Sequence, residues 1–239
     1  MITVTEHINA LIAAGAMSEK RFFELEIAKW KTSEERQEQI TGEKYYRGQH
    51  DILKRRRTAI GPDGKLKEIS NLPNNKLVNN QYGKIADQKN NYLLGKPFNL
   101  QTDDENYELE LGEIFNKRFH RTLKNLGEDS LNCGVGWLYV YYDEKGELSF
   151  KRFAPWEILP FWKDDEHTVL DCVVRVYETE EYEGDDLKII EKVEIYKSTG
   201  VERYILQDGV LREDGNGAYF NAVLPDGGVQ PFNWEKIPV

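Results

Sequence analysis

The chain has 239 residues, of which 39% are hydrophobic and 31% are charged. This length suffices for one large domain or two smaller ones, and 13 Tyr, 10 Phe and 5 Trp exclude a disordered chain. No apolar run approaches the roughly 20 residues of a membrane-spanning helix, and the start lacks the basic region of a signal peptide. We therefore expect a soluble, cytoplasmic protein without a membrane partner, in which Cys133 and Cys172 are reduced thiols.

The net charge of -10 is unevenly distributed along the chain. Residues 43–90 hold about 11 Lys or Arg against about 5 acidic residues, so the remainder carries about -16. An acidic protein with one basic belt is not a general nucleic-acid coat. The belt either contacts DNA locally or pairs with the acidic part of the same chain, and composition favours the second.

The first part of the chain predicts three helices. Thr5 is expected to cap the first helix and Ser18 the second. A capping box of Thr32 and Glu35 is expected to open a third, very polar helix. The second helix needs a partner surface, because it carries an apolar stripe of Phe22, Phe23, Ile27 and Trp30.

A long irregular connection, rich in Gly and Pro, is expected at residues 49–75. The clearest single helix follows at about 76–95, where Gly95 provides the stop signal. A further helical region is expected from about 103 to 132.

Beyond residue 136 the hydrophobic period changes from helical to two-residue, which predicts strands. The expected strands are 137–142, 147–153, 169–177, 187–196 and 201–206. Helices followed by an antiparallel β meander define the α+β class rather than α/β. The predicted segments are an N-terminal helical segment (1–48), an irregular basic connection (49–75) and an α+β domain (76–239), with helices in 76–132 and strands in 136–239.

The sequence offers no catalytic motif. The four histidines are scattered, no GxSxG occurs, and GPDGKLK lacks the pattern of a phosphate-binding loop. We therefore expect no catalytic residue, no metal and no cofactor. The alternative is a metal-dependent nuclease or other hydrolase. It would use the carboxylates of the predicted hairpins, namely Asp143, Glu144, Glu178, Glu180, Glu181, Glu183, Asp185 and Asp186.

The densest cationic patch is a candidate contact for an anionic partner, either DNA phosphates or an acidic protein surface. It consists of Lys54, Arg55, Arg56 and Arg57. The preferred interpretation is a solvated loop or pairing with the protein's own acids, because four adjacent charges point in several directions. Aromatic residues in strands more often pack in a core than bind a ligand, so those of the predicted strands are expected in the core rather than in a base-stacking site. These include Trp137, Trp156, Trp162, Tyr139, Tyr141 and Tyr142.

Four stretches follow one another in a specific order. They are YYRGQHDILKRRR, NKLVNNQYGKIADQKNNYLLGKPF, GEDSLNCGVGWLYVYYDEKGELSFKRFAPWEILPFWKD and WEKIPV. Their order and spacing resemble the portal, or head-to-tail connector, proteins of tailed bacteriophages of the Gram-positive phage and prophage type. The most specific feature is the helix that closes with residues 92–97, and the resemblance covers most of the chain.

The resemblance implies a non-enzymatic, structural subunit of a dodecameric portal ring. Viral double-stranded DNA passes through such a ring during packaging and ejection. The implied partners are further copies of the chain, terminase, scaffolding and capsid proteins, and head-completion and tail proteins. The implied location is the capsid vertex of the virion, after assembly in the cytoplasm of the bacterial host.

Portal proteins have a wing, a stem, a clip and a crown, and this chain resembles the wing-bearing N-terminal portion. It ends at Val239, near the transition from wing to stem, so stem, clip and crown are expected to be absent from this fragment. No DNA-contact residue is therefore carried over from the family. We expect the fragment to be mainly monomeric, because truncation removes interface area. Another virion adaptor module with the same α+β layout is the second alternative.

Overall fold

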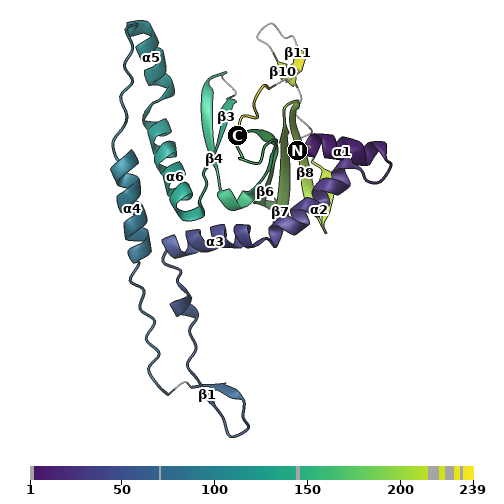
Figure 1. Cartoon of the computed structure of the whole chain (residues 1–239). Helices are drawn as coiled ribbons and strands as arrows, with labels where there is room; N and C mark the ends of the chain where they lie inside the picture. The colour runs from purple at the N-terminus through teal and green to yellow at the C-terminus, as the bar shows by residue number, and fades with distance from the viewer. Residues whose placement is uncertain (1–2, 70, 144–145, 215–220, 224–228, 232–233) are drawn as a thin grey trace. The chain divides into compact units, whose positions relative to one another are not determined.

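The structure is a computed structural model that describes residues 3–69, 71–143, 146–214, 221–223, 229–231 and 234–239. Its helices and antiparallel sheets confirm the predicted α+β class (Figure 1). No helix of the described ranges is long and apolar enough to span a bilayer. The helices are α1 (Val4–Ala13), α2 (Glu19–Lys31), α3 (Glu34–Tyr46), α4 (Gln81–Leu94), α5 (Glu105–Ile114) and α6 (Lys117–Cys133), with 3-10 helices η1 (Asp51–Lys54) and η2 (Pro155–Glu157).

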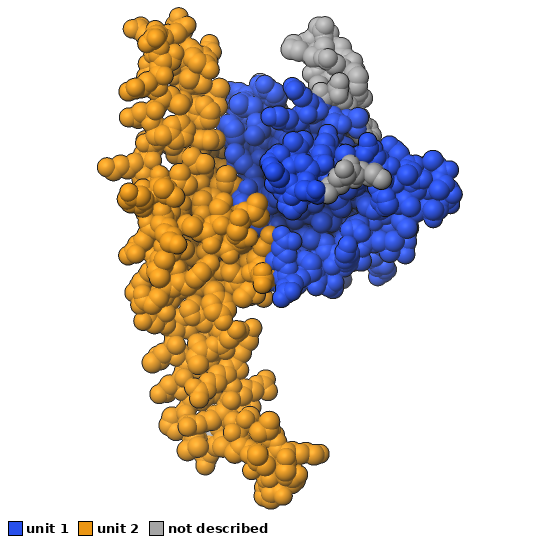
Figure 2. All heavy atoms as spheres, in the orientation of Figure 1, with its two compact units in different colours: residues 1–37, 136–239 blue, residues 38–135 orange. Residues whose placement is uncertain are grey.

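The strands form several antiparallel sheets. They are β1 (Thr58–Ile60), β2 (Leu66–Glu68), β3 (Trp137–Tyr142), β4 (Leu148–Phe153), β5 (Ile158–Trp162), β6 (Leu170–Glu183), β7 (Asp186–Lys197), β8 (Gly200–Gln207), β9 (Val210–Glu213), β10 (Asn221–Val223) and β11 (Val229–Pro231). The chain divides into two compact units (Figure 2). Unit 1 comprises residues 1–37 and 136–239, and unit 2 comprises residues 38–135.

Unit 1 contains a five-stranded sheet in the order β5-β6-β7-β8-β9. Each strand pairs antiparallel with its neighbour in sequence, which confirms the predicted meander. The longest pairing joins β6 to β7, from Val173 opposite Tyr196 to Glu183 opposite Asp186. β-Branched side chains of these two strands fill the core, and each is at most 4% exposed: Val173, Val174, Val176, Val193 and Ile195.

Helices α1 and α2 lie against this sheet (Figure 1). The predicted apolar stripe of α2 is buried at Phe23 and Ile27, each 1% exposed. Glu24, on the same helix, accepts a hydrogen bond of 3.0 Å from the backbone N–H of Leu211 in β9. Helix α2 is therefore held to the sheet by apolar burial and by one buried polar contact.

A largely buried charge network joins β6 to η2 and β7. The Arg175 guanidinium in β6 donates to Glu157 at 2.9 and 3.0 Å and to Glu194 at 3.3 Å. The Cζ atom of this guanidinium lies 4.2 Å from the centroid of the Phe153 ring and 3.9 Å from the centroid of the Tyr177 ring. The side chain is 9% exposed, so both its charge and its flat faces are matched inside the protein.

Unit 2 packs its helices through small and polar residues. The side chain of Asn90 in α4 is 2% exposed and donates a hydrogen bond of 2.9 Å to the Lys124 carbonyl in α6. Gly42 of α3 lies against the backbone of Asn132 in α6. Helix α6 then ends at Gly134, whose φ of 79° gives the left-handed cap from which the chain enters β3.

Two predicted helix starts are wrong. The first helix is capped by Thr3, which forms a capping box with Glu6. Thr5 instead donates backbone and hydroxyl hydrogen bonds to the Asp171 carboxylate of β6, a partner too distant in sequence to be predicted. At the start of the third helix, Ser33 takes the place expected for Thr32. The Ser33 hydroxyl accepts a hydrogen bond of 3.3 Å from the backbone N–H of Arg36.

Other differences concern helix continuity and short strands. The helical region predicted from 103 to 132 is two helices, because Asn116 caps a new start by accepting from Arg118 N and Phe119 N. The stretch 49–75, predicted as irregular, contains η1 and the β1–β2 hairpin. Strands β5 and β9 were not predicted, because their short apolar runs are ambiguous by periodicity alone.

Candidate interaction surfaces

The basic run lies in the long excursion that leaves α3 and returns to α4. Figure 1 shows the excursion as two extended segments that end in the β1–β2 hairpin. We call residues 49–79 the basic arm. Two hydrogen bonds join the two segments of the arm beside the basic run. Arg57 donates one of 2.6 Å to the Pro73 carbonyl, and Asn74 donates one of 3.1 Å to the Arg55 carbonyl.

The four predicted site residues of the arm, Lys54, Arg55, Arg56 and Arg57, are all exposed. Lys54 forms an ion pair of 3.4 Å with Asp51, in which both side chains are more than 70% exposed. Within the described ranges, the guanidinium groups of Arg55 and Arg56 form no ion pair. They therefore present two positive charges to solvent.

The tip of the arm carries an exposed apolar pair. Ile60 and Leu66 lie opposite each other in the β1–β2 register and are 75% and 72% exposed. Lys65 and Lys67 flank Leu66 and are also exposed, and Lys67 pairs with Asp63 at 3.2 Å. The tip therefore presents an uncovered apolar pair, and the positive charges of Arg55 and Arg56 lie further along the arm.

The predicted hairpin carboxylates lie mainly along β6 and β7. Most of their side chains are exposed, including Glu178, Glu180, Glu181, Asp185 and Asp186. Glu144 and the side chain of Glu183 lie outside the described part of the structure. Glu181 pairs with Lys192 at 2.8 Å, whereas Glu180, Asp185 and Asp186 form no ion pair with a described residue.

These carboxylates do not converge in the described part of the chain. There, no group of three or more His, Cys, Asp or Glu side chains is placed to hold a metal ion. The nuclease alternative therefore finds no supporting geometry in those ranges. We call residues 178–191, at the far end of the β6–β7 pairing, the acidic hairpin.

The acidic hairpin also carries an apolar strip. Tyr182 lies opposite Leu187, and Glu180 lies opposite Ile189. Since paired residues share a face and side chains alternate, Tyr182, Leu187 and Ile189 point to one side of the hairpin. Their exposed fractions are 76%, 49% and 66%.

The apolar strip lies on the same face of the sheet as the paired Val176 and Val193, which are at most 4% exposed. Between the strip and this core pair, the face carries Glu180 and the opposed Glu178 and Glu191. The strip is therefore an exposed apolar group that acidic side chains separate from the core. An apolar surface of this kind is typical of a binding site.

Histidine and cysteine side chains are placed for packing. His50 stacks on Tyr45 at 4.8 Å between ring centroids, and His167 stacks on Trp162 at 5.1 Å. Burial, followed by the charge of the neighbouring Asp171, raises the pKa of the Cys172 thiol. These groups lie on separate elements and form no nucleophile–base pair.

Of the six aromatic residues that we expected in the core, Trp137 is buried and four are half-buried, namely Tyr139, Tyr141, Trp156 and Trp162. Trp137 is 7% exposed, and Tyr139 contacts the rings of Phe153 and Tyr196 at 5.5 and 5.2 Å. Tyr142 differs from the expectation because it is 74% exposed at the end of β3.

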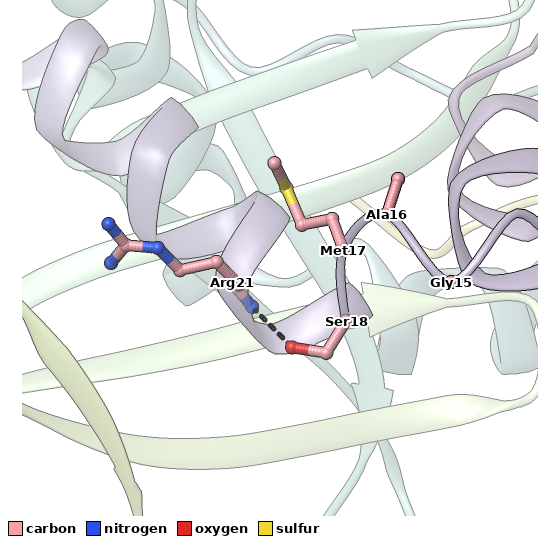
Figure 3. A pocket seen from close by; sticks show the side chains of 5 residues that line it. All are labelled: Gly15, Ala16, Met17, Ser18 and Arg21. Atoms are coloured by element: carbon pink, nitrogen blue, oxygen red, sulfur yellow. Dashed lines mark hydrogen bonds between the residues drawn. The ribbon is translucent and has the colours of Figure 1, made fainter.

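A shallow depression lies at the turn between α1 and α2 (Figure 3). It is lined by Gly15, Ala16, Met17, Ser18 and Arg21. The Ser18 hydroxyl accepts from the Arg21 N–H at 3.2 Å, which confirms the predicted cap of α2. The Arg21 guanidinium points away from Met17 in Figure 3 and donates 2.9 Å to Glu24. The depression is therefore lined by a helix cap.

Sequence reasoning found the basic run but missed the apolar pairs beside the two charged surfaces. Ile60 and Leu66 flank the segment GPDGK, and Tyr182 and Leu187 flank the acidic segment EGDD. Apolar residues at equal distances from a turn are the signal that would have found them, because such residues pair across a hairpin.

Two oppositely charged surfaces with exposed apolar side chains indicate a protein that contacts other macromolecules. Residues 27–227 match the family described as "Phage portal protein, SPP1 Gp6-like". The chain belongs to this family of phage portal proteins, as the resemblance in the sequence indicated. Phage portal proteins are structural components of the virion.

Individual relatives agree with the family match. The chain is 25% identical over 239 residues to the portal protein of Bacillus phage SPP1, covering 99% of this chain and 47% of that protein. It is 28% identical over 152 residues to the portal protein of Clostridium phage phiCD119, covering 59% of this chain and 33% of that protein. The chain thus spans about half the length, or less, of the curated relatives it matches.

Proposed function

We propose that this chain is part of a structural subunit of a phage portal ring, through which viral double-stranded DNA is packaged and ejected. The observation that carries the proposal is the match to portal proteins over residues 27–227. The proposed role is mechanical and non-catalytic. The ring would be a dodecamer at a capsid vertex, assembled in the cytoplasm of the bacterial host.

The proposed partners follow from the same role. They are terminase during packaging, scaffolding and capsid proteins during assembly, and head-completion and tail proteins afterwards. We also propose that residues 1–48, 49–75 and 76–239 act as a helical segment, a basic connection and a wing-like domain. A mainly monomeric state of the 239-residue chain by itself belongs to the same proposal.

Negative-stain electron microscopy of the complete encoded protein that contains these residues tests the proposal. Rings with an open central channel are expected. Compact particles without rings would contradict the portal role. Purified protein would then be assayed for cleavage of double-stranded DNA with Mg²⁺ or Mn²⁺, the readout of the nuclease alternative.

A further inference from the structure

The basic arm and the acidic hairpin have opposite charges of similar size. The arm holds seven Lys or Arg (54, 55, 56, 57, 65, 67 and 76) against three acids (51, 63 and 68), a net charge of +4. The hairpin holds seven acids (178, 180, 181, 183, 185, 186 and 191) against one Lys (188), a net charge of -6. Charge complementarity of this kind steers association and fixes the register of partners.

The two surfaces also match in their apolar content. The arm tip presents Ile60 and Leu66, and the hairpin presents Tyr182, Leu187 and Ile189 on one face. Each surface therefore offers an apolar centre beside charge, which is the usual anatomy of a protein–protein contact. Binding to DNA phosphates alone would leave the exposed Ile60 and Leu66 without a role.

We propose that the basic arm of one copy of this chain docks on the acidic hairpin of a neighbouring copy. Two different surfaces of the same chain then make a head-to-tail contact, which closes into a ring when the rotation between copies permits. The inference rests on the proposed ring and names one contact within it. A contact of two hairpin tips lies well below roughly 1,000 Å², so it is weak in isolation.

Mixed disulfide cross-linking tests the contact directly. One chain carries Ile60→Cys and the other carries Leu187→Cys, and the two are mixed under mild oxidation. A disulfide-linked dimer containing one copy of each is expected. The matched control replaces the second variant by Leu109→Cys, which is 70% exposed on α5 and lies on neither surface. The wild-type chain reports the background from Cys133 and Cys172.

Charge substitution tests the electrostatic part. Arg55→Glu/Arg56→Glu takes the net charge of the arm from +4 to 0, and Glu180→Lys/Asp185→Lys takes that of the hairpin from -6 to -2. Each is expected to lower the yield of cross-linked dimer by about tenfold, because the attraction across the contact is weakened. Combining the first pair with Ile60→Cys and the second with Leu187→Cys places the new Glu side chains opposite the new Lys side chains, and the yield is expected to recover in part. Lys84→Glu/Lys89→Glu on α4 is the control that matches the arm variant in its change of net charge.

Several results would overturn the inference. One is a yield no greater than that of the Leu109→Cys control. Another is a chain with both Ile60→Cys and Leu187→Cys that forms only an internal disulfide, since the arm would then dock within its own copy. A third is that Arg55→Glu/Arg56→Glu abolishes binding to a double-stranded DNA fragment and leaves cross-linking unchanged. Rings of the complete protein without this cross-link would refute the contact and leave the portal role intact, whereas failure of the complete protein to form rings would refute that role.

Discussion

The Tyr46 hydroxyl, at the last residue of α3, lies 2.7 Å from Asp87 Oδ1 in α4, to which it donates a hydrogen bond. The same hydroxyl lies 3.2 Å from Glu128 Oε1 in α6. The backbone carbonyl of Tyr46 accepts a hydrogen bond of 2.7 Å from Asn80 Nδ2. One residue therefore connects the end of α3 to α4 and α6. Burial, followed by the hydrogen bond to Asp87, raises the pKa of the phenol.

Tyr46→Phe removes the hydroxyl and keeps the ring. We expect a loss of about 1 kcal/mol in the free energy of unfolding, since the acceptors are carboxylates that water reaches in part. For a chain of this size that corresponds to about 2–4 °C in Tm. Tyr92→Phe is the control, because Tyr92 is 89% exposed on α4. Equal Tm values for the two variants in calorimetry would show that the Tyr46 contacts contribute nothing.

This junction illustrates what the sequence could and could not predict. Helix α4 and the β3–β4 hairpin were predicted from local signals, namely apolar periodicity and turn residues. Tyr46, Asp87 and Glu128 are separated by about 40 residues from one to the next, and no local pattern links them. The same is true of Thr5 and Asp171, whose contact displaced the predicted helix cap. The charges of the arm and the hairpin were visible in the sequence, but their exposure and the apolar residues beside them required the structure.

Gly42 permits a close approach between α3 and α6. A Cβ added at this position would overlap the Asn132 carbonyl, whereas one added at Gly112 of α5 meets nothing within 4 Å. We expect Gly42→Ala to lower the free energy of unfolding by about 1–3 kcal/mol, because a backbone carbonyl cannot yield as a flexible side chain does.

Gly112→Ala is the matched control for Gly42→Ala. It should raise stability by about 0.5–1 kcal/mol, since Ala loses less backbone entropy than Gly in a helix. Urea unfolding followed by circular dichroism measures both variants. Stabilisation by Gly42→Ala would show that α3 and α6 are not closely packed there.

Arg175 balances two carboxylates in unit 1. Its removal leaves Glu157 and Glu194, which are 24% and 13% exposed, without their main cation. We expect Arg175→Met to cost about 3 kcal/mol, because breaking a buried pair strands an uncompensated charge. Arg203→Met is the control, since Arg203 is 36% exposed and lies 3.7 Å from Glu194.

The control variant should cost about 0–1 kcal/mol, the usual range for an exposed pair. Equilibrium unfolding in urea measures both values. If the two variants lose the same stability, the network around Arg175 is not the main polar support of the sheet.

Tyr196 makes the stability of unit 1 depend on pH at the alkaline end. Its side chain is 3% exposed and its hydroxyl donates 2.9 Å to Glu194. Burial, followed by the charge of Glu194, raises the pKa of this phenol in the folded state. Its contribution to stability is therefore complete below the unfolded pKa of about 10 and is lost as the pH rises toward the folded value.

We accordingly expect the urea midpoint to fall between about pH 8 and about pH 10.5, because the unfolded chain then releases a phenolic proton that the folded chain retains. Tyr196→Phe should be less stable than wild type at the lower pH and should lose less on going to the higher one. Tyr182→Phe, at a 76% exposed position of the acidic hairpin, should leave the pH dependence unchanged. Identical pH dependence in wild type and Tyr196→Phe would mean that other groups, such as the Tyr46 and Tyr204 phenols with their raised pKa values, cause the alkaline loss.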